Sequence, residues 1–218
     1  MTTLVYYCVF TQRGTPMRIR TEAKRDAIVE IASQVFRESG FDGASMAVIS
    51  ARVGGSKRTL YGYFDSKEGL FGAVAQSAAD TLFTPVFESL INSEESFPNA
   101  LIKFGHAIVE LGCDEQTLQI FRTMIGVSGR SIIGIQFYLS GPARGLEILA
   151  GYLQSLIESG VLKNCDPAIA AQHLNALLQS ETLLPSLLGA LKPSTTEHLK
   201  QSAERAVRTF LDAYALQP

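Results

Sequence analysis

The sequence predicts an all-α fold, in which three short N-terminal helices precede a larger group of helices. Apolar residues recur at steps of three and four along most of the chain, the period at which one face of an α-helix repeats. Beyond Asn92, no stretch of any length alternates between apolar and polar residues as a half-buried strand does. Hydrophobic residues make up 46% of the 218 residues and charged residues 18%, which permits a substantial core and argues against disorder.

Hydroxyl residues and glycines bound the three N-terminal helices. The first helix is predicted to begin near Ala23 and to end at Gly40, because glycine suits a helix C-cap. Ser45 is a good N-cap for a second, short helix, which ends at Gly54. Ser56 can then cap the third helix. This layout is typical of a helix-turn-helix unit, whose last helix lies in the major groove of DNA.

The third helix carries a basic and aromatic face. Leu60 and Phe64 are four residues apart and are expected to point inward. Lys57, Arg58 and Tyr61 share a different face, which we expect to be exposed. Positive charge suits DNA phosphates, and a tyrosine adds both an apolar body and a hydroxyl. The face therefore indicates a DNA-binding helix.

The remaining helices are predicted from the turn-forming residues between them. Asp65 and Ser66 offer a cap for a helix that runs into the high 80s and that Pro85 kinks or interrupts. Further helices are predicted at about 97–112, 115–127, 131–159, 166–190 and 195–215. Gly141 and Pro142 are expected to break or kink the helix in which they lie.

Charge is distributed unevenly along the chain. The net charge is −2, which by itself does not favour nucleic-acid binding. Residues 1–70, however, contain ten Lys and Arg against seven Asp and Glu, a net charge of +3. Residues 71–218 contain nine against fourteen, a net charge of −5. The basic half is therefore the half with the predicted helix-turn-helix unit.

Residues 1–17 are expected to be a disordered or wrongly assigned extension, because Met17 stands directly before a basic, helix-ready stretch. The DNA-binding part then covers residues 18–65 and the helical body residues 66–218. Arg18 and Arg20 could also form an arm that contacts the DNA backbone or minor groove, and the two interpretations can hold together. The apolar run from Leu4 to Phe10 is far shorter than the roughly 20 residues of a membrane span, so no membrane partner is expected.

Other function classes find little support in the sequence. Cys8, Cys113 and Cys165 are widely spaced and form no CxxC motif, so neither a disulfide framework nor a zinc site is expected, and a reducing cytoplasm fits best. The chain contains no GxSxG, GxxxxGK[ST] or HExxH motif, and its three histidines lie far apart. We therefore expect no enzymatic activity, no catalytic residue, no metal and no cofactor.

A long, ordered motif runs through the N-terminal region and comprises Phe36–Phe41, Ser45–Val53 and Ser56–Phe71. It resembles the TetR family of bacterial repressors over residues 20–75. The resemblance implies that Lys57–Tyr63 is the recognition helix. It also implies phosphate contacts from Ser45, Ser56, Tyr63 and Lys67. Gly55 departs from the family, which usually has an apolar residue there, and is expected to loosen the turn at a cost of about 0.5–1 kcal/mol.

The predicted DNA contacts combine this resemblance with the chemistry of the residues. The hydroxyls of Ser45, Ser56 and Thr59, together with helix N-terminal amides, suit phosphates. The third helix contains neither Asn nor Gln, the usual readers of adenine, so base readout is expected from Arg58, Thr59 and Tyr61. The full candidate set is Ser45, Ser56, Lys57, Arg58, Thr59, Tyr61, Tyr63 and Lys67.

The body carries a second motif, formed by Phe137–Leu146, Tyr152 with Leu153, and Asp166–Leu191. It is similar to the C-terminal domains of the AefR-like branch of the TetR family. The resemblance implies a ligand bound among the middle helices and a homodimer formed through the last two, near 166–190 and 195–215. The helix at 166–190 is too apolar around its circumference for a surface helix, so a second subunit is expected to cover part of it.

The middle helices contain large side chains with few charges among them, which predicts a mostly apolar small-molecule site. The candidate lining residues are Phe104, Phe121, Met124, Phe137, Tyr138, Leu149 and Tyr152. Plain core packing is the alternative for some of them. His106 is expected to be a core histidine with its own partner rather than a ligand anchor, and Gly141 with Pro142 is expected to form the rim.

Taken together, the sequence predicts a repressor that a small apolar or amphipathic effector releases from a pseudo-palindromic, double-stranded DNA operator. The alternative is a helical protein of the same fold that binds a small molecule but has no role in transcription. The second glycine of the turn, Gly55, and the modest positive charge of the N-terminal half favour this alternative.

Overall fold

The computed structural model describes residues 21–129, 131–191 and 195–216. The predictions for residues 1–17, including Cys8, and for Arg18 and Arg20 lie outside these ranges. The described chain consists of helices and turns, with one isolated bridge between Leu162 and Ala215. The prediction of an all-α fold is therefore confirmed.

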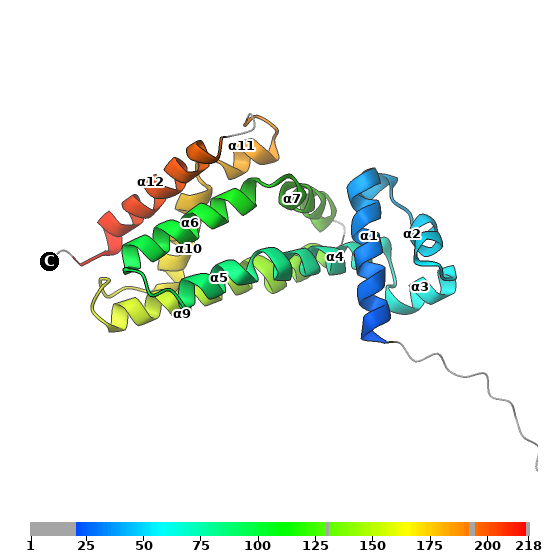
Figure 1. The fold of residues 1–218 in the computed structure, drawn as a ribbon, viewed down its shortest axis with the longest axis horizontal. Coiled ribbons are helices and arrows are strands. Elements are labelled where there is room, and N and C mark those ends of the chain that lie inside the picture. Colours follow the sequence, from blue (N-terminus) through cyan, green and yellow to red (C-terminus); the bar gives the residue numbers. More distant parts are fainter. Residues whose placement is uncertain (1–20, 130, 192–194, 217–218) are drawn as a thin grey trace, which may run out of the picture.

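Figure 1 shows a small head at one end of the molecule and an elongated helical body at the other, joined by α4. The head helices are α1 (Glu22–Gly43), α2 (Met46–Val53) and α3 (Lys57–Tyr63), followed by α4 (Lys67–Leu82). The body contains α5 (Thr84–Ile91), α6 (Phe97–Cys113), α7 (Glu115–Ser128), α8 (Ile133–Tyr138), the π-helical segment η1 (Leu139–Ala143), α9 (Arg144–Glu158), α10 (Pro167–Gln179), α11 (Leu183–Leu187) and α12 (Thr196–Tyr214).

Hydroxyl side chains cap the head helices where the sequence predicted caps. Ser45 accepts a hydrogen bond from the amide of Val48 at the start of α2, and Ser56 accepts one from the amide of Thr59 at the start of α3. Ser66 caps α4 in the same way. Such bonds satisfy helix N-terminal amides that have no partner within the helix.

The core of the head includes residues of α7 from the body. Phe71 packs edge-on against Phe36 and Phe41, with ring centroids 5.0 and 5.2 Å apart. This cluster contains Ile28, Val29, Ala32, Val35, Phe36, Ala44, Met46, Ile49, Leu60, Phe64, Leu70, Phe71, Val74 and Ala75, together with Ile120, Met124 and Val127 of α7. The head and the body thus share a packed boundary.

Two prolines act as the sequence predicted. Pro85 lies in the first turn of α5, so the long helix is interrupted after Leu82. Gly141 and Pro142 lie in η1, a single π-helical segment between α8 and α9. Proline has no amide hydrogen to donate, so a local change of helix geometry at this point is expected.

The predicted continuous helix over 166–190 is wrong. The structure ends α10 at Gln179 and begins α11 at Leu183, with a turn between them. Pro185 explains the break, because a proline inside a helix clashes with the carbonyl four residues earlier. By starting anew at Leu183, the chain places Pro185 in the first turn of α11, where proline is tolerated.

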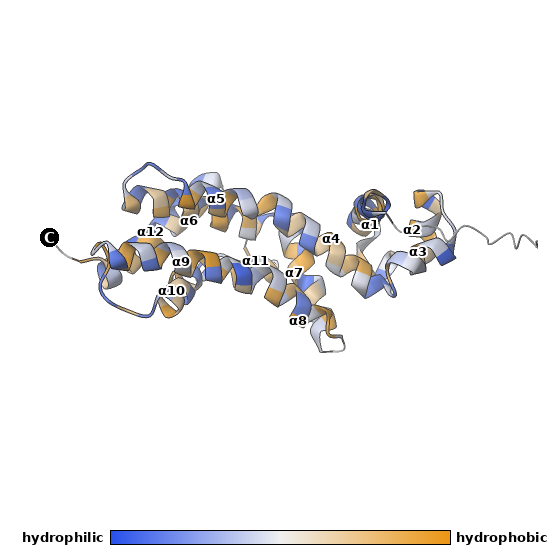
Figure 2. Cartoon of the chain, turned by 90° about the horizontal axis from the view of Figure 1, so that it is seen from below, coloured by the Kyte–Doolittle hydropathy of each residue, from blue (hydrophilic) through white to orange (hydrophobic). Residues whose placement is uncertain are grey.

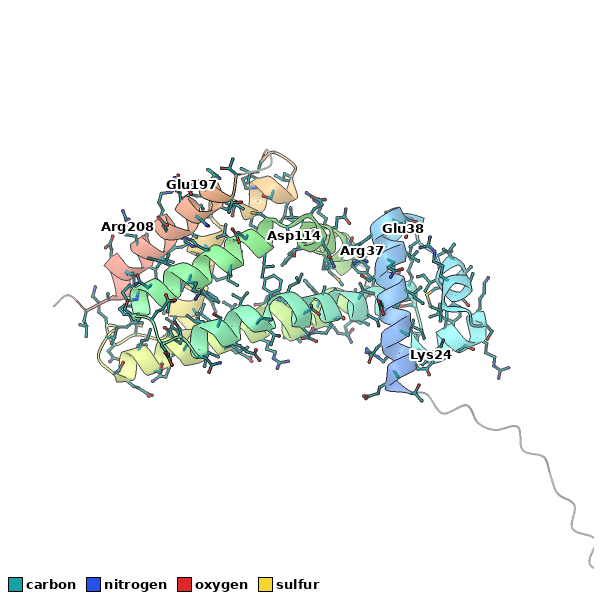
Figure 3. All side chains as sticks on the ribbon, viewed as in Figure 1. Lys24, Arg37, Glu38, Asp114, Glu197 and Arg208 are labelled. Atoms are coloured by element: carbon teal, nitrogen blue, oxygen red, sulfur yellow. The ribbon has the colours of Figure 1, made fainter. Side chains whose placement is uncertain are left out.

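A second core holds the body together. Leu101 and Phe104 of α6 pack with Leu174 and Leu178 of α10 and with the buried side of α12. The opposite side of α12 is polar, and Figure 3 shows Glu197 and Arg208 on it. Among the described residues, no helix is both long and apolar enough to cross a membrane.

Candidate nucleic-acid interface and internal cavity

The outer face of α3 matches the sequence prediction. Lys57, Arg58 and Tyr61 are exposed, with 49% of Tyr61 accessible, whereas Leu60 is 2% exposed and packs into the head. In Figure 1, α3 lies on the side of the head away from the body. The helix therefore presents two cationic side chains and one aromatic side chain to solvent on the end of the molecule.

The serine and threonine hydroxyls of the interface are already engaged in the helix caps. Ser56 Oγ accepts the Thr59 amide at 3.1 Å and shares a second hydrogen bond with Thr59 Oγ1 at 2.9 Å. Ser45 Oγ accepts the Val48 amide at 3.3 Å. In Ser45 the capping oxygen is an acceptor, so its own hydrogen remains available to donate to a phosphate.

Tyr63 and Lys67, for which phosphate contacts were predicted, also form hydrogen bonds with other residues of the head. The Tyr63 hydroxyl accepts the backbone amide of Thr21 at 3.1 Å, which leaves its own hydrogen available. Lys67 Nζ donates to the carbonyls of Phe41 at 2.8 Å and Ala44 at 3.2 Å, and lies 4.3 Å from the Phe41 ring centroid. An ammonium group has three donors, so one remains for a phosphate.

The turn between α2 and α3 depends on Ser50, which the sequence analysis did not single out. Gly54 adopts a left-handed conformation with φ of 68° and ends α2. Ser50 is buried, its hydroxyl donates to the Gly55 carbonyl at 2.9 Å, and the Gly55 amide donates to the Ser50 carbonyl at 3.2 Å. These bonds oppose the loosening expected from the second glycine.

An exposed ion pair links α1 to α2. Arg52 binds the carboxylate of Glu38, and their hydrogen bond lowers the pKa of Glu38 below its ordinary value. Both groups are at the surface, so the pair contributes little stability.

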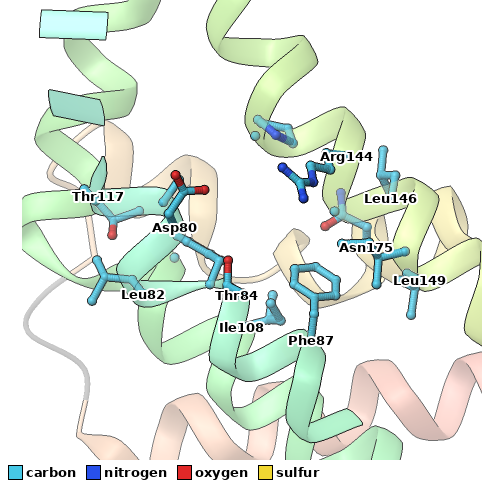
Figure 4. Close-up of a pocket in the computed structure, with 18 of the residues that line it drawn as sticks. Asp80, Leu82, Thr84, Phe87, Ile108, Thr117, Arg144, Leu146, Leu149 and Asn175 are labelled. Carbon is cyan, nitrogen blue, oxygen red and sulfur yellow. The ribbon is translucent and has the colours of Figure 1, made fainter. Parts of the chain in front are cut away.

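The body contains a cavity of about 380 Å³, whose wall is formed by residues of α4, α5, α6, α7, η1, α9 and α10. Figure 4 shows part of this wall. Four of the predicted lining residues, Phe104, Phe121, Phe137 and Leu149, do line it. Phe83 and Phe87 add two more aromatic side chains. Gly141 and Pro142 are also part of its wall. The size is within the range of about 300–1,000 Å³ that is usual for small-molecule sites.

The other predicted lining residues lie elsewhere. Met124 is 2% exposed and belongs to the core of the head. Tyr138 is 53% exposed at the surface of α8. Tyr152 packs against the body core, where burial raises the pKa of its phenol. His106 does not line the cavity either, and its Nε2 lies 3.4 Å from the Glu204 carboxylate on α12.

The cavity has polar wall residues that the sequence analysis missed. Figure 4 shows Thr117 at one side of the cavity and Arg144 with Asn175 at the other. Thr117 is 4% exposed, and its hydroxyl has no hydrogen-bond partner in the part of the chain that the structure describes. Arg144 is exposed and forms no ion pair within the described residues. Asp80 accepts a hydrogen bond from Gln76 at 2.9 Å.

The helix-turn-helix head, with its exposed basic recognition face, defines this protein as a DNA-binding transcriptional regulator. Residues 28–74 match the model for bacterial regulatory proteins of the tetR family, and residues 99–216 match the C-terminal domain of AefR-like transcriptional repressors. The second match alone spans more than half of the chain. The chain belongs to the TetR family of transcriptional regulators.

Individual relatives agree with this assignment. The chain is 31% identical over 209 residues to the HTH-type transcriptional repressor ComR of Escherichia coli strain K12, which covers 93% of this chain and 94% of ComR. A TetR-family protein structure from Mesorhizobium loti MAFF303099 matches with a TM-score of 0.82 and 27% identity, over 90% of this chain and 100% of that one. The flavonoid-responsive regulator FrrA matches with a TM-score of 0.72 and 30% identity, over 91% and 100%.

Proposed function

We propose that this protein is a dimeric repressor whose α3 binds the major groove of an operator and whose body cavity binds the effector that releases it. The observation that carries the proposal is the combination, in one chain, of the exposed face of α3 and the apolar cavity against α4. Helix α4 contributes both to the core of the head and to the cavity wall.

The proposed DNA contacts divide into two groups. Arg58, Thr59 and Tyr61 read base edges, because they lie on the recognition helix. The remaining contacts hold the phosphate backbone through hydroxyls, helix N-termini and positive charge, and come from Ser45, Ser56, Lys57, Tyr63 and Lys67. The phosphate contacts fix the register of the head on the duplex.

The proposed dimer forms through α10, α11 and α12. Part of this surface remains apolar and uncovered in the single chain, because Ile169, Leu184 and Leu188 are 44%, 64% and 73% exposed. A second subunit that covers these residues would bury their apolar surface. A dimer of two-fold symmetry would also present two α3 helices to the two half-sites of a pseudo-palindrome.

The proposed effector is an apolar or amphipathic molecule with aromatic character. Five phenylalanines line the cavity, and two edge-to-face pairs are formed by Phe87 with Phe104 and by Phe121 with Phe137. Such walls favour a ring system that continues the edge-to-face packing. The relative FrrA responds to flavonoids, which are aromatic compounds, and this supports the same chemical class for the present chain.

Release follows from a shift between two conformations. The effector binds more tightly to a conformation in which the two α3 helices no longer fit successive major grooves, so effector and operator compete. Thermodynamic linkage makes the coupling reciprocal. The operator must therefore weaken effector binding by the same factor by which the effector weakens operator binding.

The test has two stages. Full-length protein first selects bound sequences from a random DNA pool, and flavonoids and other small aromatic compounds are then screened for release of the selected operator. The proposal predicts a compound that lowers operator affinity and whose own affinity falls equally when operator is saturating. An effector whose affinity is unchanged by saturating operator would contradict the mechanism. Ligand binding without any selected DNA would favour a protein of this fold that has no role in transcription.

A further inference from the structure

Two polar side chains lie on one side of the largely apolar body cavity. Arg144 is the first residue of α9, and Asn175 belongs to α10. The two helices pack against each other, and Figure 2 shows α9 beside α10. Figure 4 shows both side chains on the same side of the cavity. Among the described residues of the cavity wall, Arg144 is the only one with a positive charge.

Both side chains carry hydrogen-bond donors that have no acceptor in the described part of the chain. The side-chain oxygen of Asn175 accepts a hydrogen bond from the side-chain amide of Gln179 at 3.0 Å. The amide nitrogen of Asn175 donates to none of the described residues. The guanidinium of Arg144 forms neither an ion pair nor a hydrogen bond with any of them. This part of the wall therefore offers donors from two side chains and lacks an acceptor.

A carboxylate matches this set of donors. The planar guanidinium of an arginine can donate two parallel hydrogen bonds to one carboxylate, and such charge-assisted bonds are roughly twice as strong as neutral ones. The amide of Asn175 can donate a further hydrogen bond to the same group. A neutral acceptor could use the same hydrogen bonds, but it would leave the charge of Arg144 without a counter-charge. The wall therefore favours a ligand that carries an acid group.

The aromatic part of the wall begins directly beside Arg144. The next residue is Gly145, and a Cβ atom there would lie 3.0 Å from Phe87 Cζ. The missing side chain of Gly145 therefore allows the ring of Phe87 to lie against the start of α9. Phe87 also packs edge-on against Phe104, with ring centroids 5.3 Å apart. A ligand ring that contacts Phe87 would therefore place an acid substituent beside Arg144.

Two carboxylates also line the cavity and raise the alternative of a cationic ligand. Asp80 of α4 and Glu88 of α5 are exposed, and neither forms an ion pair with Arg144 within the described ranges. Asp80 accepts a hydrogen bond from Gln76 at 2.9 Å, and Figure 4 shows it apart from Arg144. A cationic ligand would leave the donors of Arg144 and Asn175 unpaired, whereas an acid engages both. The donors therefore favour the acid.

We propose that the effector is an aromatic acid, whose carboxylate binds Arg144 and Asn175 and whose ring packs against Phe87 and Phe104. This proposal rests on the proposed function, because it specifies the class of ligand that the body cavity takes. It goes beyond an aromatic ligand in general, because it assigns the charge of the ligand and the residues that recognise this charge.

The first test compares three probes that share one ring system. Naphthoic acid, naphthamide and naphthylmethylamine are an anion, a neutral molecule and a cation at neutral pH. Isothermal titration calorimetry measures the binding of each probe to the full-length protein without DNA. Naphthoate should bind at least about tenfold more tightly than naphthamide, as expected for a charge-assisted hydrogen bond. No binding of naphthoate, or tighter binding of the amide or the amine, would overturn the proposal.

The second test uses variants of the wall. Arg144→Leu should weaken naphthoate binding about tenfold and leave naphthamide binding in place. Lys103→Gln removes an exposed positive charge outside the cavity wall and should change neither. Gly145→Val should weaken both probes, because it displaces Phe87. Gly151→Val is the matched control on the same helix, because a Cβ there meets nothing within 4 Å, and it should weaken neither. Circular dichroism confirms that each variant is folded.

The ratio of the two affinities separates recognition of charge from a structural role. If Arg144→Leu weakened naphthoate and naphthamide equally, or changed neither, the proposal would be overturned. Because the titrations contain no DNA, their result is independent of the proposed function. A protein that prefers naphthoate through Arg144 but selects no operator would keep the acid site and lose the proposed function. A protein that selects an operator but does not prefer naphthoate would lose only the acid site.

Discussion

Gly54 and Gly55 are neighbours in the turn before the recognition helix, but only one of them needs to be glycine. Gly54 has a φ of 68°, which side chains with a Cβ rarely adopt. Gly55 lies outside the left-handed region, and a Cβ there would make ordinary contacts of 3.9 and 4.0 Å with Thr59 and Val53. Glycine at position 55 therefore removes a side-chain contact, and the backbone conformation there does not require a glycine.

Alanine substitutions distinguish the two glycines. Gly54→Ala should lower the free energy of unfolding by about 1–2 kcal/mol, because the left-handed conformation costs that much for a residue with a Cβ. Gly55→Ala should raise it by about 0.4–1 kcal/mol, because it restricts the unfolded chain. Urea unfolding followed by circular dichroism measures both, and equal effects of the two substitutions would contradict this turn geometry.

Lys57 and Tyr61 should contribute to DNA binding in different ways. Lys57→Ala should weaken binding to all sequences and lower the slope of log affinity against log salt by about one, because one phosphate contact is lost. Tyr61→Ala should change the preferred sequence instead. Lys103→Ala, at an exposed site on the body, is the control for loss of one positive charge. Gel-shift titrations at several salt concentrations are the measurement, and wild-type behaviour of both head variants would reject the assignment.

Lys67 should matter for both folding and DNA binding. Lys67→Met keeps most of the side chain but leaves the carbonyls of Phe41 and Ala44 without this donor. The free energy of unfolding should fall by about 1–3 kcal/mol, as for other buried groups that lose a partner. If the third donor contacts a phosphate, the salt slope should also fall. A stability loss without any change in the salt slope would limit Lys67 to its structural role.

The starts of helices that are marked by a capping residue in the sequence were predicted well. Ser45, Ser56 and Ser66 act as caps where the sequence placed them, because capping depends on residues only three positions apart. The break between α10 and α11 was missed although Pro185 signals it. Apolar residues continue at helical spacing across the break between α10 and α11, so the pattern of apolar residues did not indicate an interruption.

The turn between α10 and α11 is tied to α12 by an ion pair. Arg205 donates two hydrogen bonds to the carboxylate of Glu181 at 3.0 and 2.5 Å, and this lowers the pKa of Glu181 below the ordinary 4.5. The pKa of this carboxyl group is lower in the folded chain than in the unfolded chain. The ion pair therefore stabilises the folded protein fully at a pH above the pKa that the group has in the unfolded chain. This stabilisation is lost as the pH falls through the pKa of the group in the folded chain.

The unfolding free energy of Glu181→Gln should therefore be lower than that of the wild type at neutral pH. The difference should shrink once the pH falls below 4.5. Because both groups are largely exposed, the effect should be small and should decrease further in high salt. Urea titrations across this pH range measure it. A difference that grows toward acid pH would contradict the pairing.

For the whole chain, the exposed basic face of α3 could be predicted from the sequence, whereas the lining of the cavity could be predicted only in part. The face lies on one short helix with local caps, so its residues can be placed without knowledge of the rest of the fold. The cavity depends on how α7 is oriented between head and body. Thr117 and Phe121 of α7 line the cavity, Met124 packs into the core of the head, and Ile120 takes part in both.

Both faces of α7 contain apolar residues, so the spacing of apolar residues in the sequence could not show which face lines the cavity. This is why Phe121 was predicted correctly as a wall residue and Met124 was not. Arg144 and Asn175 were missed for a related reason, since their place in the wall follows from the packing of α9 and α10.

The dimer can be tested independently of DNA. Leu184→Glu together with Leu188→Glu places two charges on the exposed apolar surface of α11 and should shift the protein toward monomer in analytical ultracentrifugation. Ile91→Glu, at a residue of α5 that is 55% exposed, is the matched control and should leave the dimer intact. The proposed interface would be contradicted if the wild-type protein were a monomer. It would also be contradicted if the variant with both leucine substitutions remained a dimer.

The most direct test of DNA recognition by α3 is selection of bound sequences from a random pool of double-stranded DNA with the full-length protein. Recognition through α3 predicts enrichment of a pseudo-palindrome with two half-sites about 10 base pairs apart, or a multiple of that distance. It also predicts that this enrichment is lost in a variant with both Lys57→Ala and Tyr61→Ala. Failure of the wild-type protein to enrich any sequence, or equal enrichment by the variant, would contradict recognition of DNA through this helix.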